Sequence, residues 1–151
     1  MRCAWRIVKR RHSTTAFDGE GAWLYGGRWN SRGTRVVYTS ATLSLAALES
    51  LVHLNPPIAF KFVAIPVEFD EALLEVVRLS GLPPDWAVEP PTPSSMRIGD
   101  QWVSQARSAV LEVPSVVIPT ESNFILNPAH AHFSRVQIGK PVPFSFDSRL
   151  L

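Results

Sequence analysis

Arg28, Tyr38 and Glu49 lie within one stretch of the sequence, YGGRWNSRGTRVVYTSATLSLAALESLV, which covers residues 25–52. Arg28 follows two glycines and begins a segment rich in Gly, Ser and Asn. Small residues let a ligand approach the backbone closely, and an arginine there can fork to the oxygens of a phosphate or a carboxylate. A surface arginine on a tight turn would give the same pattern. The stretch therefore indicates either an anion-binding loop or a simple turn.

Glu49 is the residue of this stretch that packing alone explains least. Its neighbours one helical turn away are Leu45, Ala46, Val52 and His53, and apolar residues lie on all sides, so we expect most of this helix to be buried. A carboxylate on such a helix must be paired, protonated or at the wall of a cavity. Two interpretations stay open: Glu49 lies on a solvent-facing stripe, or it lines a pocket that shifts its pKa.

Three further polar side chains have an ordinary structural interpretation beside a functional one. Tyr38 ends a short apolar run and fits a half-buried strand position. Asn123 and Asn127 flank an apolar segment, and buried asparagines hold loops by binding backbone groups.

Several familiar kinds of site are not indicated. No glycine-rich dinucleotide fingerprint lies between a strand and a helix, and there is no P-loop. Ser44 and Ser115 lack the G-x-S-x-G context, which argues against a serine hydrolase triad. His130 and His132 have no cysteine or third carboxylate nearby, and Cys3 is the only cysteine. We therefore expect neither a metal site nor an internal disulfide.

The elements that must position these residues alternate irregularly between strand and helix. Strands are predicted over residues 3–8, 35–39, 60–67, 109–113, 115–118, 135–138 and 142–146. Helices are predicted over residues 42–54, with Ser40 as N-cap and the stop Asn55-Pro56-Pro57, and over 98–107. Residues 73–77 fit either type, and loops are predicted over 13–34, 82–95 and 119–134. Strands dominate, which predicts the α+β class.

The bulk composition is that of an ordinary globular protein. Its 151 residues predict one domain, residues 1–151, that can bury a real core. The net charge of +2 does not require a nucleic-acid partner, and the step Lys9-Arg10-Arg11 fits a solvated loop or a small nucleic-acid patch. No apolar run approaches the roughly 18 residues of a membrane-spanning helix. The start has no apolar signal region, so we expect a cytoplasmic location.

Four segments together resemble the RES-domain family, the toxins of bacterial RES–Xre toxin–antitoxin pairs. They are Trp5-Arg6-Ile7, the block GGRWNSRGTRVVYTSATLSLAALESLVHL (26–54), VPSVVIPTESNFILNP (113–128) and FDSRL (146–150). The resemblance covers nearly the whole chain. The family takes its name from an arginine, a glutamate and a serine, and the matching positions are Arg28, Glu49 and Ser115, with Ser122 as the other candidate for the serine.

The resemblance implies a split mixed β-sheet with flanking helices around a cleft, similar to the fold of ADP-ribosyltransferase toxins. It implies that the protein degrades NAD+ at the nicotinamide–ribose bond and so arrests growth. Water or inorganic phosphate would be the acceptor, and no cofactor is needed. Two alternatives are transfer of ADP-ribose to a protein or nucleotide, and a non-catalytic or RNA-binding module that uses Lys9-Arg10-Arg11.

The resemblance also implies partners. An Xre-like antitoxin would cover the cleft, the toxin would be a homodimer within a larger complex, and DNA would be reached only through the antitoxin. No membrane partner is implied.

The matching side chains can each be given a role against NAD+. Arg28 would clamp a phosphate, and Trp29 beside it would stack or belong to the core. Tyr38, which matches the tyrosine that ends the family's strand, would stack on nicotinamide. Glu49 would stabilise the oxocarbenium-like ribose, orient its hydroxyls or activate water. Ser115 and Asn123, the asparagine before the LNP segment, would hydrogen-bond the nicotinamide amide or the ribose. We expect Glu49 to face the cleft within reach of Arg28.

Overall fold

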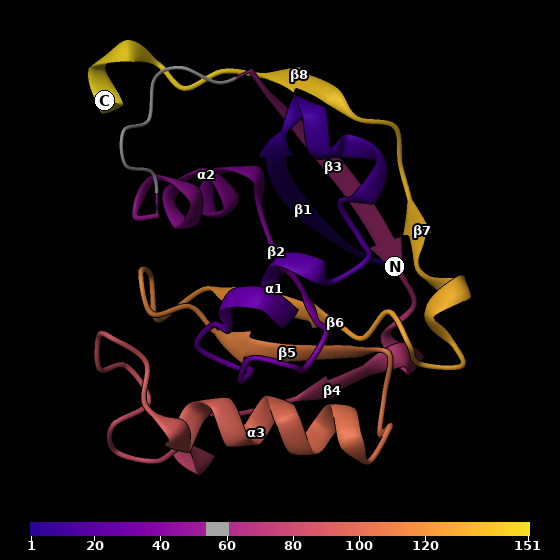
Figure 1. The fold of residues 1–151 in the computed structure, drawn as a ribbon, viewed down its shortest axis with the longest axis vertical. Coiled ribbons are helices and arrows are strands. Elements are labelled where there is room, and N and C mark those ends of the chain that lie inside the picture. The colour runs from indigo at the N-terminus through magenta and orange to yellow at the C-terminus, as the bar shows by residue number, and fades with distance from the viewer. Residues whose placement is uncertain (54–60) are drawn as a thin grey trace.

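The computed structural model describes residues 1–53 and 61–151, and a mixed β-sheet forms its centre (Figure 1). The paired strands follow the order β4-β5-β6-β2-β1-β3-β7, and β8 also pairs with β3. The described strands are β1 (Arg2–Lys9), β2 (Val37–Ser40), β3 (Phe62–Phe69), β4 (Leu74–Val76), β5 (Val110–Pro114), β6 (Ser122–Leu126), β7 (Gln137–Ile138) and β8 (Val142–Phe144). The α-helices are α1 (Glu20–Tyr25), α2 (Leu43–Leu51) and α3 (Pro93–Ser104). No helix among the described residues is long and apolar enough to cross a membrane.

The sheet opens between its two central strands. β1 pairs with β3 along its whole length, from Arg2 to Lys9, but it shares only the pair Trp5↔Ser40 with β2. In Figure 1, β1 and β3 lie in the upper half of the molecule and β4, β5 and β6 in the lower half. Only β4 and β5 run parallel among the described pairs. The predicted α+β fold with a split mixed sheet is therefore confirmed.

Both faces of the lower sheet are covered by apolar side chains. One face carries a cluster that includes Phe69, Phe124 and Leu126. The other face packs Leu111 and Ile125 against the loop before β2 and against α3. The close fit of α3 is visible at Gly99, where an added Cβ would lie 1.7 Å from the carbonyl oxygen of Trp29. Small residues on this helix therefore let it pack directly against the loop that carries Arg28.

Most predicted strands are present, and the errors have physical causes. Residues 3–8, 35–39 and 109–113 fall on β1, β2 and β5, while 135–138 and 142–146 are shortened to β7 and β8. Within 60–67, β3 begins at Phe62 and residue 60 lies outside the described residues. The prediction of a strand over 115–118 is wrong, because the Ser115 hydroxyl accepts hydrogen bonds from two following backbone N–H groups and closes a turn.

Three loop or helix boundaries are also wrong. The range 119–134 contains β6, whose apolar residues pair with β2 and β5 despite the flanking asparagines. The range 13–34 contains α1 and part of a 3₁₀ helix, Arg10–Thr15. The helix predicted at 98–107 begins at Pro93, a residue type suited to a first helical position. Within 73–77, which fitted either type, Leu73 ends a 3₁₀ turn and residues 74–76 form β4.

The helix that carries Glu49 begins and ends differently from the prediction. Its N-cap is Thr42 and not Ser40, because the Thr42 side chain accepts a hydrogen bond from the Leu45 N–H. It ends at Leu51, and the predicted stop at Asn55-Pro56-Pro57 lies outside the described residues. The expectation of a mostly buried helix is wrong: only Leu45 and Ala46 are buried.

Candidate active site

Glu49 is held by two neutral side chains from the opposite side of the sheet split. Its Oε1 atom accepts a hydrogen bond of 2.7 Å from the Ser115 hydroxyl and one of 2.9 Å from the Asn123 amide. Ser115 is fully buried, whereas Glu49 is half-buried. Both hydrogen bonds of Glu49 within the described part of the chain go to Oε1, and every buried polar side-chain atom there has a partner. The second carboxylate oxygen therefore remains in contact with solvent.

The orientation of the Asn123 amide is fixed from behind. Its oxygen accepts a hydrogen bond of 2.7 Å from the Ser40 hydroxyl, so its nitrogen must face Glu49. Ser40 and Asn123 are cross-strand partners in β2 and β6. α2 follows β2 almost directly, with Thr42 as its N-cap. This short connection keeps Glu49 close to Ser40 and Asn123. Local chain connectivity and strand register together build this cluster, which we call the Glu49 cluster: Glu49, Ser115, Asn123 and Ser40.

Ser115, and not Ser122, is the serine beside Glu49. The Ser115 hydroxyl donates to Glu49 and accepts from the backbone N–H groups of Val117 and Ile118, each at 3.1 Å. A hydroxyl has one hydrogen and two lone pairs, so this one is fully used within the protein. Ser122 instead donates to Glu112 at 2.8 Å. Ser115 therefore positions the Glu49 carboxylate.

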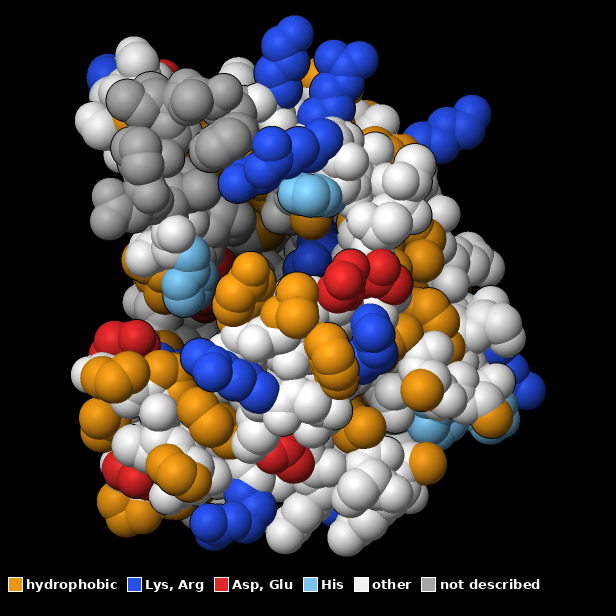
Figure 2. Space-filling model, viewed as in Figure 1, with side chains coloured by type: hydrophobic (Ala, Val, Ile, Leu, Met, Phe, Trp, Pro, Cys, Tyr) orange, Lys and Arg blue, Asp and Glu red, His pale blue; other side chains and the backbone are white. Residues whose placement is uncertain are grey.

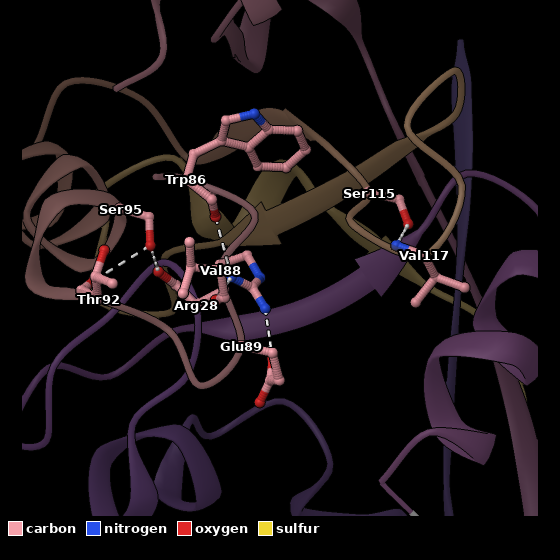
Figure 3. A network of polar contacts seen from close by, with 8 residues as sticks. All are labelled: Arg28, Trp86, Val88, Glu89, Thr92, Ser95, Ser115 and Val117. Atoms are coloured by element: carbon pink, nitrogen blue, oxygen red, sulfur yellow. Dashed lines mark hydrogen bonds and ion pairs between the residues drawn. The ribbon is translucent and has the colours of Figure 1, made fainter. Parts of the chain in front are cut away.

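Arg28 lies in a second network, formed with the segment that precedes α3 (Figure 3). Its Nη1 atom donates to the carbonyl oxygens of Trp86 at 3.0 Å and Val88 at 2.8 Å, and its Nη2 atom lies 2.6 Å from Glu89 Oε2. No hydrogen bond or ion pair joins Arg28 to Glu49 in the described residues. The close-up shows Ser115 apart from Arg28, on the other side of the view. The two predicted site residues therefore belong to separate polar networks.

Tyr38 organises the loop that presents Arg28. Its hydroxyl donates to Asn30 Oδ1 at 2.6 Å and accepts from the Trp29 N–H at 3.1 Å. Gly27 is required beside it, because an added Cβ would lie 2.6 Å from this hydroxyl. Burial raises the pKa of Tyr38 well above its ordinary value, and the nearby Asp100 carboxylate adds to the rise. The hydroxyl is thus a neutral structural link.

Asn30 and Trp29 complete this loop. The two N–H groups of the Asn30 amide face three carbonyl oxygens, those of Ala22, Ser31 and Thr34, so one hydrogen is shared. Trp29 is buried, with 2% of its surface exposed, and its ring packs against that of Trp86 at 6.2 Å between centroids. Its position fits the core interpretation of this residue. The loop around Arg28 is therefore rigidly attached to the rest of the fold.

Arg6 is a residue that sequence reasoning quoted but gave no role. Its Nη1 atom donates to the Tyr38 carbonyl oxygen at 3.0 Å and its Nε atom to that of Ala16 at 2.7 Å. The guanidinium thus occupies the place where β1 and β2 separate. Burial lowers its pKa to about 10, partly opposed by Asp18. The signal in the sequence was its alternation with Ala4 and Val8, which puts a charge on an inward-facing side of β1.

The structure offers no metal centre at these networks. No group of three or more His, Cys, Asp or Glu residues in the part of the chain that the structure describes could hold a metal ion. A hollow of about 400 Å³ lies elsewhere, between the 3₁₀ helix after β1 and the β3–β7 edge; its lining includes Thr15, Phe17, Ile65 and Pro141. Neither Arg28 nor Glu49 lines it.

Comparison with known proteins decides the family. The model of the RES domain matches residues 4–147. The chain belongs to the RES domain family. The resemblance found in the sequence is thereby confirmed. The RES domain chain is 36% identical to a protein named Toxin Res from Yersinia enterocolitica, over 97% of each chain. It is 38% identical to one named Prs ADP-ribosylating toxin from a Sphingobium species, over 97% of this chain and 95% of the relative.

A solved structure has the same fold. A chain in the crystal structure of the M. tuberculosis MbcT–MbcA toxin–antitoxin complex matches with a TM-score of 0.75, over 95% of the RES domain chain and 84% of that chain. The sequence identity is 13%, so this likeness concerns the fold alone. The split mixed sheet is therefore shared between the RES domain chain and a chain of that complex.

Proposed function

We propose that the protein is the toxin of a toxin–antitoxin pair and that it cleaves the nicotinamide–ribose bond of NAD+. Two observations outside the site support this proposal: membership of the RES domain family, and relatives whose names call them toxins. The observation that carries the chemistry is the Glu49 carboxylate, fixed through Oε1 by Ser115 and Asn123 while Oε2 meets solvent.

The reaction needs a fixed negative charge more than it needs an acid. As the bond between ribose C1′ and the nicotinamide nitrogen breaks, its electron pair returns to the cationic ring and neutral nicotinamide leaves. Positive charge then develops on the ribose, where a preorganised carboxylate such as that of Glu49 stabilises it by a few kcal/mol, or about a hundred- to a thousandfold in rate. Water attacks C1′, and Glu49 Oε2 accepts its proton, which leaves ADP-ribose. Inorganic phosphate in place of water would leave ADP-ribose 1-phosphate.

The two arginines are the groups that would hold the diphosphate. Arg28 is fixed by backbone carbonyls on one side of its guanidinium, and Arg6 is fixed where the sheet opens. Arginine suits this task because its planar fork matches pairs of phosphate oxygens. Tyr38 and Asn30 would keep the Arg28 loop in place. In this assignment Glu49 acts on the ribose, while the arginines bind the substrate.

A second candidate activity is transfer of ADP-ribose to a macromolecule. It is favoured by the relative named Prs ADP-ribosylating toxin, which is 38% identical to this chain. Both activities break the same bond of NAD+ and differ only in the acceptor. The role of Glu49 is therefore the same in both.

A partner protein would complete the pair. We propose an Xre-like antitoxin that covers the site, a homodimer of the toxin within the larger complex, and contact with DNA only through the antitoxin. Exposed apolar residues support a protein partner: Leu48 lies on α2, Val52 is the residue that caps its end, and Trp23, Leu24 and Tyr25 lie on α1. Figure 2 shows hydrophobic side chains gathered over α1 in the middle of this face.

The deciding experiment measures nicotinamide released from NAD+ by the purified protein, with and without inorganic phosphate. Release without phosphate, with free ADP-ribose as the second product, indicates hydrolysis. A strong increase with phosphate indicates phosphorolysis. NAD+ labelled in the adenylate moiety, incubated with a cell extract, tests transfer through label that stays on macromolecules. NAD+ that remains intact in all three assays with folded protein would refute the proposal.

A further inference from the structure

Arg28 is a partly buried cation whose carboxylate partner lies on the surface. The Arg28 side chain is 13% exposed and that of Glu89 is 71% exposed, with 2.6 Å between Nη2 and Oε2. An ion pair with so exposed a partner is weak, and its loss changes an equilibrium constant by about fivefold at most. The Glu89 carboxylate can therefore be exchanged for another anion at little cost.

The other contacts of the guanidinium are not exchangeable. Nη1 donates to the carbonyl oxygens of Trp86 and Val88, as Figure 3 shows for this network. Trp86 is held by its packing against Trp29, and Asp85 accepts hydrogen bonds of 2.9 and 3.1 Å from two hydroxyls at the start of α3. The start of this segment is thus attached both to the core and to the start of α3. Only the Glu89 side chain is free to leave the arginine.

The guanidinium keeps one edge for a ligand. It has five N–H groups, of which both on Nη1 and one on Nη2 are used by the protein. Nε has no acceptor among the described residues, and no buried polar side-chain atom there lacks a partner, so Nε meets solvent. The Nε–Nη2 edge is a fork that matches two oxygens of a phosphate. Glu89 covers half of that edge.

We propose that Glu89 is a placeholder for ligand phosphate. Its carboxylate occupies Nη2 of Arg28 in the free protein and is displaced when a diphosphate binds the Nε–Nη2 edge, while the carbonyls of Trp86 and Val88 stay on Nη1. The exchange keeps the guanidinium neutralised and aimed when no substrate is bound. It also lowers the affinity for anions, because a ligand must displace one carboxylate. The assignment rests on the proposed function, since NAD+ supplies the diphosphate.

Binding of inorganic pyrophosphate to the full chain, measured by calorimetry, tests the exchange. Glu89→Gln should bind pyrophosphate about two- to fivefold more tightly than the unaltered protein, because a neutral amide competes less with the phosphate. Glu68→Gln is the matched control: it removes the same charge from an exposed position on β3. The gain should vanish in the background Arg28→Gln. A thermal unfolding curve for each variant checks that the fold is retained.

Several results would overturn the placeholder. They are unchanged or absent pyrophosphate binding in Glu89→Gln, an equal gain in Glu68→Gln, and a gain that persists without Arg28. Nicotinamide release separates this from the proposed function. Release from NAD+ with no response of pyrophosphate affinity would refute only the placeholder. A pyrophosphate response without any release would refute only the proposed function. If both hold, the KM for NAD+ should fall in Glu89→Gln by the same two- to fivefold.

Discussion

The Glu49 cluster and the Arg28 network each fix a charged side chain, but the groups that hold the charge differ in kind. Glu49 is held by neutral side-chain donors, Ser115 and Asn123, that are themselves fixed by the backbone or by Ser40. Arg28 is held by two backbone carbonyls and one exposed carboxylate. Glu49 thus forms no ion pair within the part of the chain that the structure describes, whereas Arg28 has a counter-ion that solvent can reach.

This difference separates chemistry from binding. A carboxylate that is held by neutral donors, and that forms no ion pair among the described residues, can direct its negative charge at a developing cation. A cation with a removable carboxylate partner can exchange that partner for a phosphate. Changes in the first network should therefore act mainly on kcat, and changes in the second mainly on KM.

The largest effect is expected for Glu49→Gln. Glutamine keeps the carbonyl oxygen that Ser115 and Asn123 bind but removes the charge, so kcat for nicotinamide release should fall about a hundred- to a thousandfold. The melting temperature should stay close to that of the unaltered protein, because the hydrogen bonds can be kept. Glu68→Gln provides the control for a lost surface charge. Full activity in Glu49→Gln would show that the Glu49 charge has no part in the mechanism. The proposed division between a catalytic network and a binding network would then be wrong.

Ser115→Ala should have the next largest effect. It takes a donor from Glu49 and an acceptor from two backbone N–H groups, so the free energy of unfolding should fall by about 1–3 kcal/mol. A carboxylate that is less well fixed should lower kcat by about tenfold, the equivalent of one lost hydrogen bond to a charged group. Ser122→Ala removes a hydroxyl that donates to Glu112 and not to Glu49, so this variant should retain kcat. A larger loss of kcat in Ser122→Ala than in Ser115→Ala would show that Ser122, and not Ser115, is the functional serine.

The sequence predicted the members of both networks better than their contacts. Glu49 was conspicuous because a carboxylate lies in an apolar helix, a matter of local pattern. Its partners, however, are 66 and 74 residues away along the chain, and only the family resemblance pointed to Ser115 and Asn123. Glu89 was missed altogether, because the proline-rich segment around it looks like a surface connection and lies 61 residues from Arg28. Contacts at such separations depend on strand register and loop packing, which one sequence does not reveal.

The errors in secondary structure have the same origin. Asn123 and Asn127 make the segment of β6 resemble a loop, yet pairing on both edges with β2 and β5 outweighs the weak strand preference of asparagine. α2 was expected to be mostly buried because it is apolar all round, but only one face meets the sheet. A surface left apolar for a partner cannot be distinguished from a core by hydropathy alone. The error is thus itself consistent with the proposed antitoxin.

The smallest effect is expected for Tyr38→Phe, which separates holding the Arg28 loop from touching the substrate. The variant leaves Asn30 Oδ1 and the Trp29 N–H without their partner, so the free energy of unfolding should fall by about 1–3 kcal/mol. If Tyr38 acts through the loop, KM for NAD+ should rise by a few-fold while kcat changes less than in Ser115→Ala. Tyr25→Phe, at a position 77% exposed, is the control and should alter neither stability nor KM. A large loss of kcat with unchanged stability would instead place the hydroxyl against the reacting groups, and the contrast between a binding network and a chemical one would no longer hold.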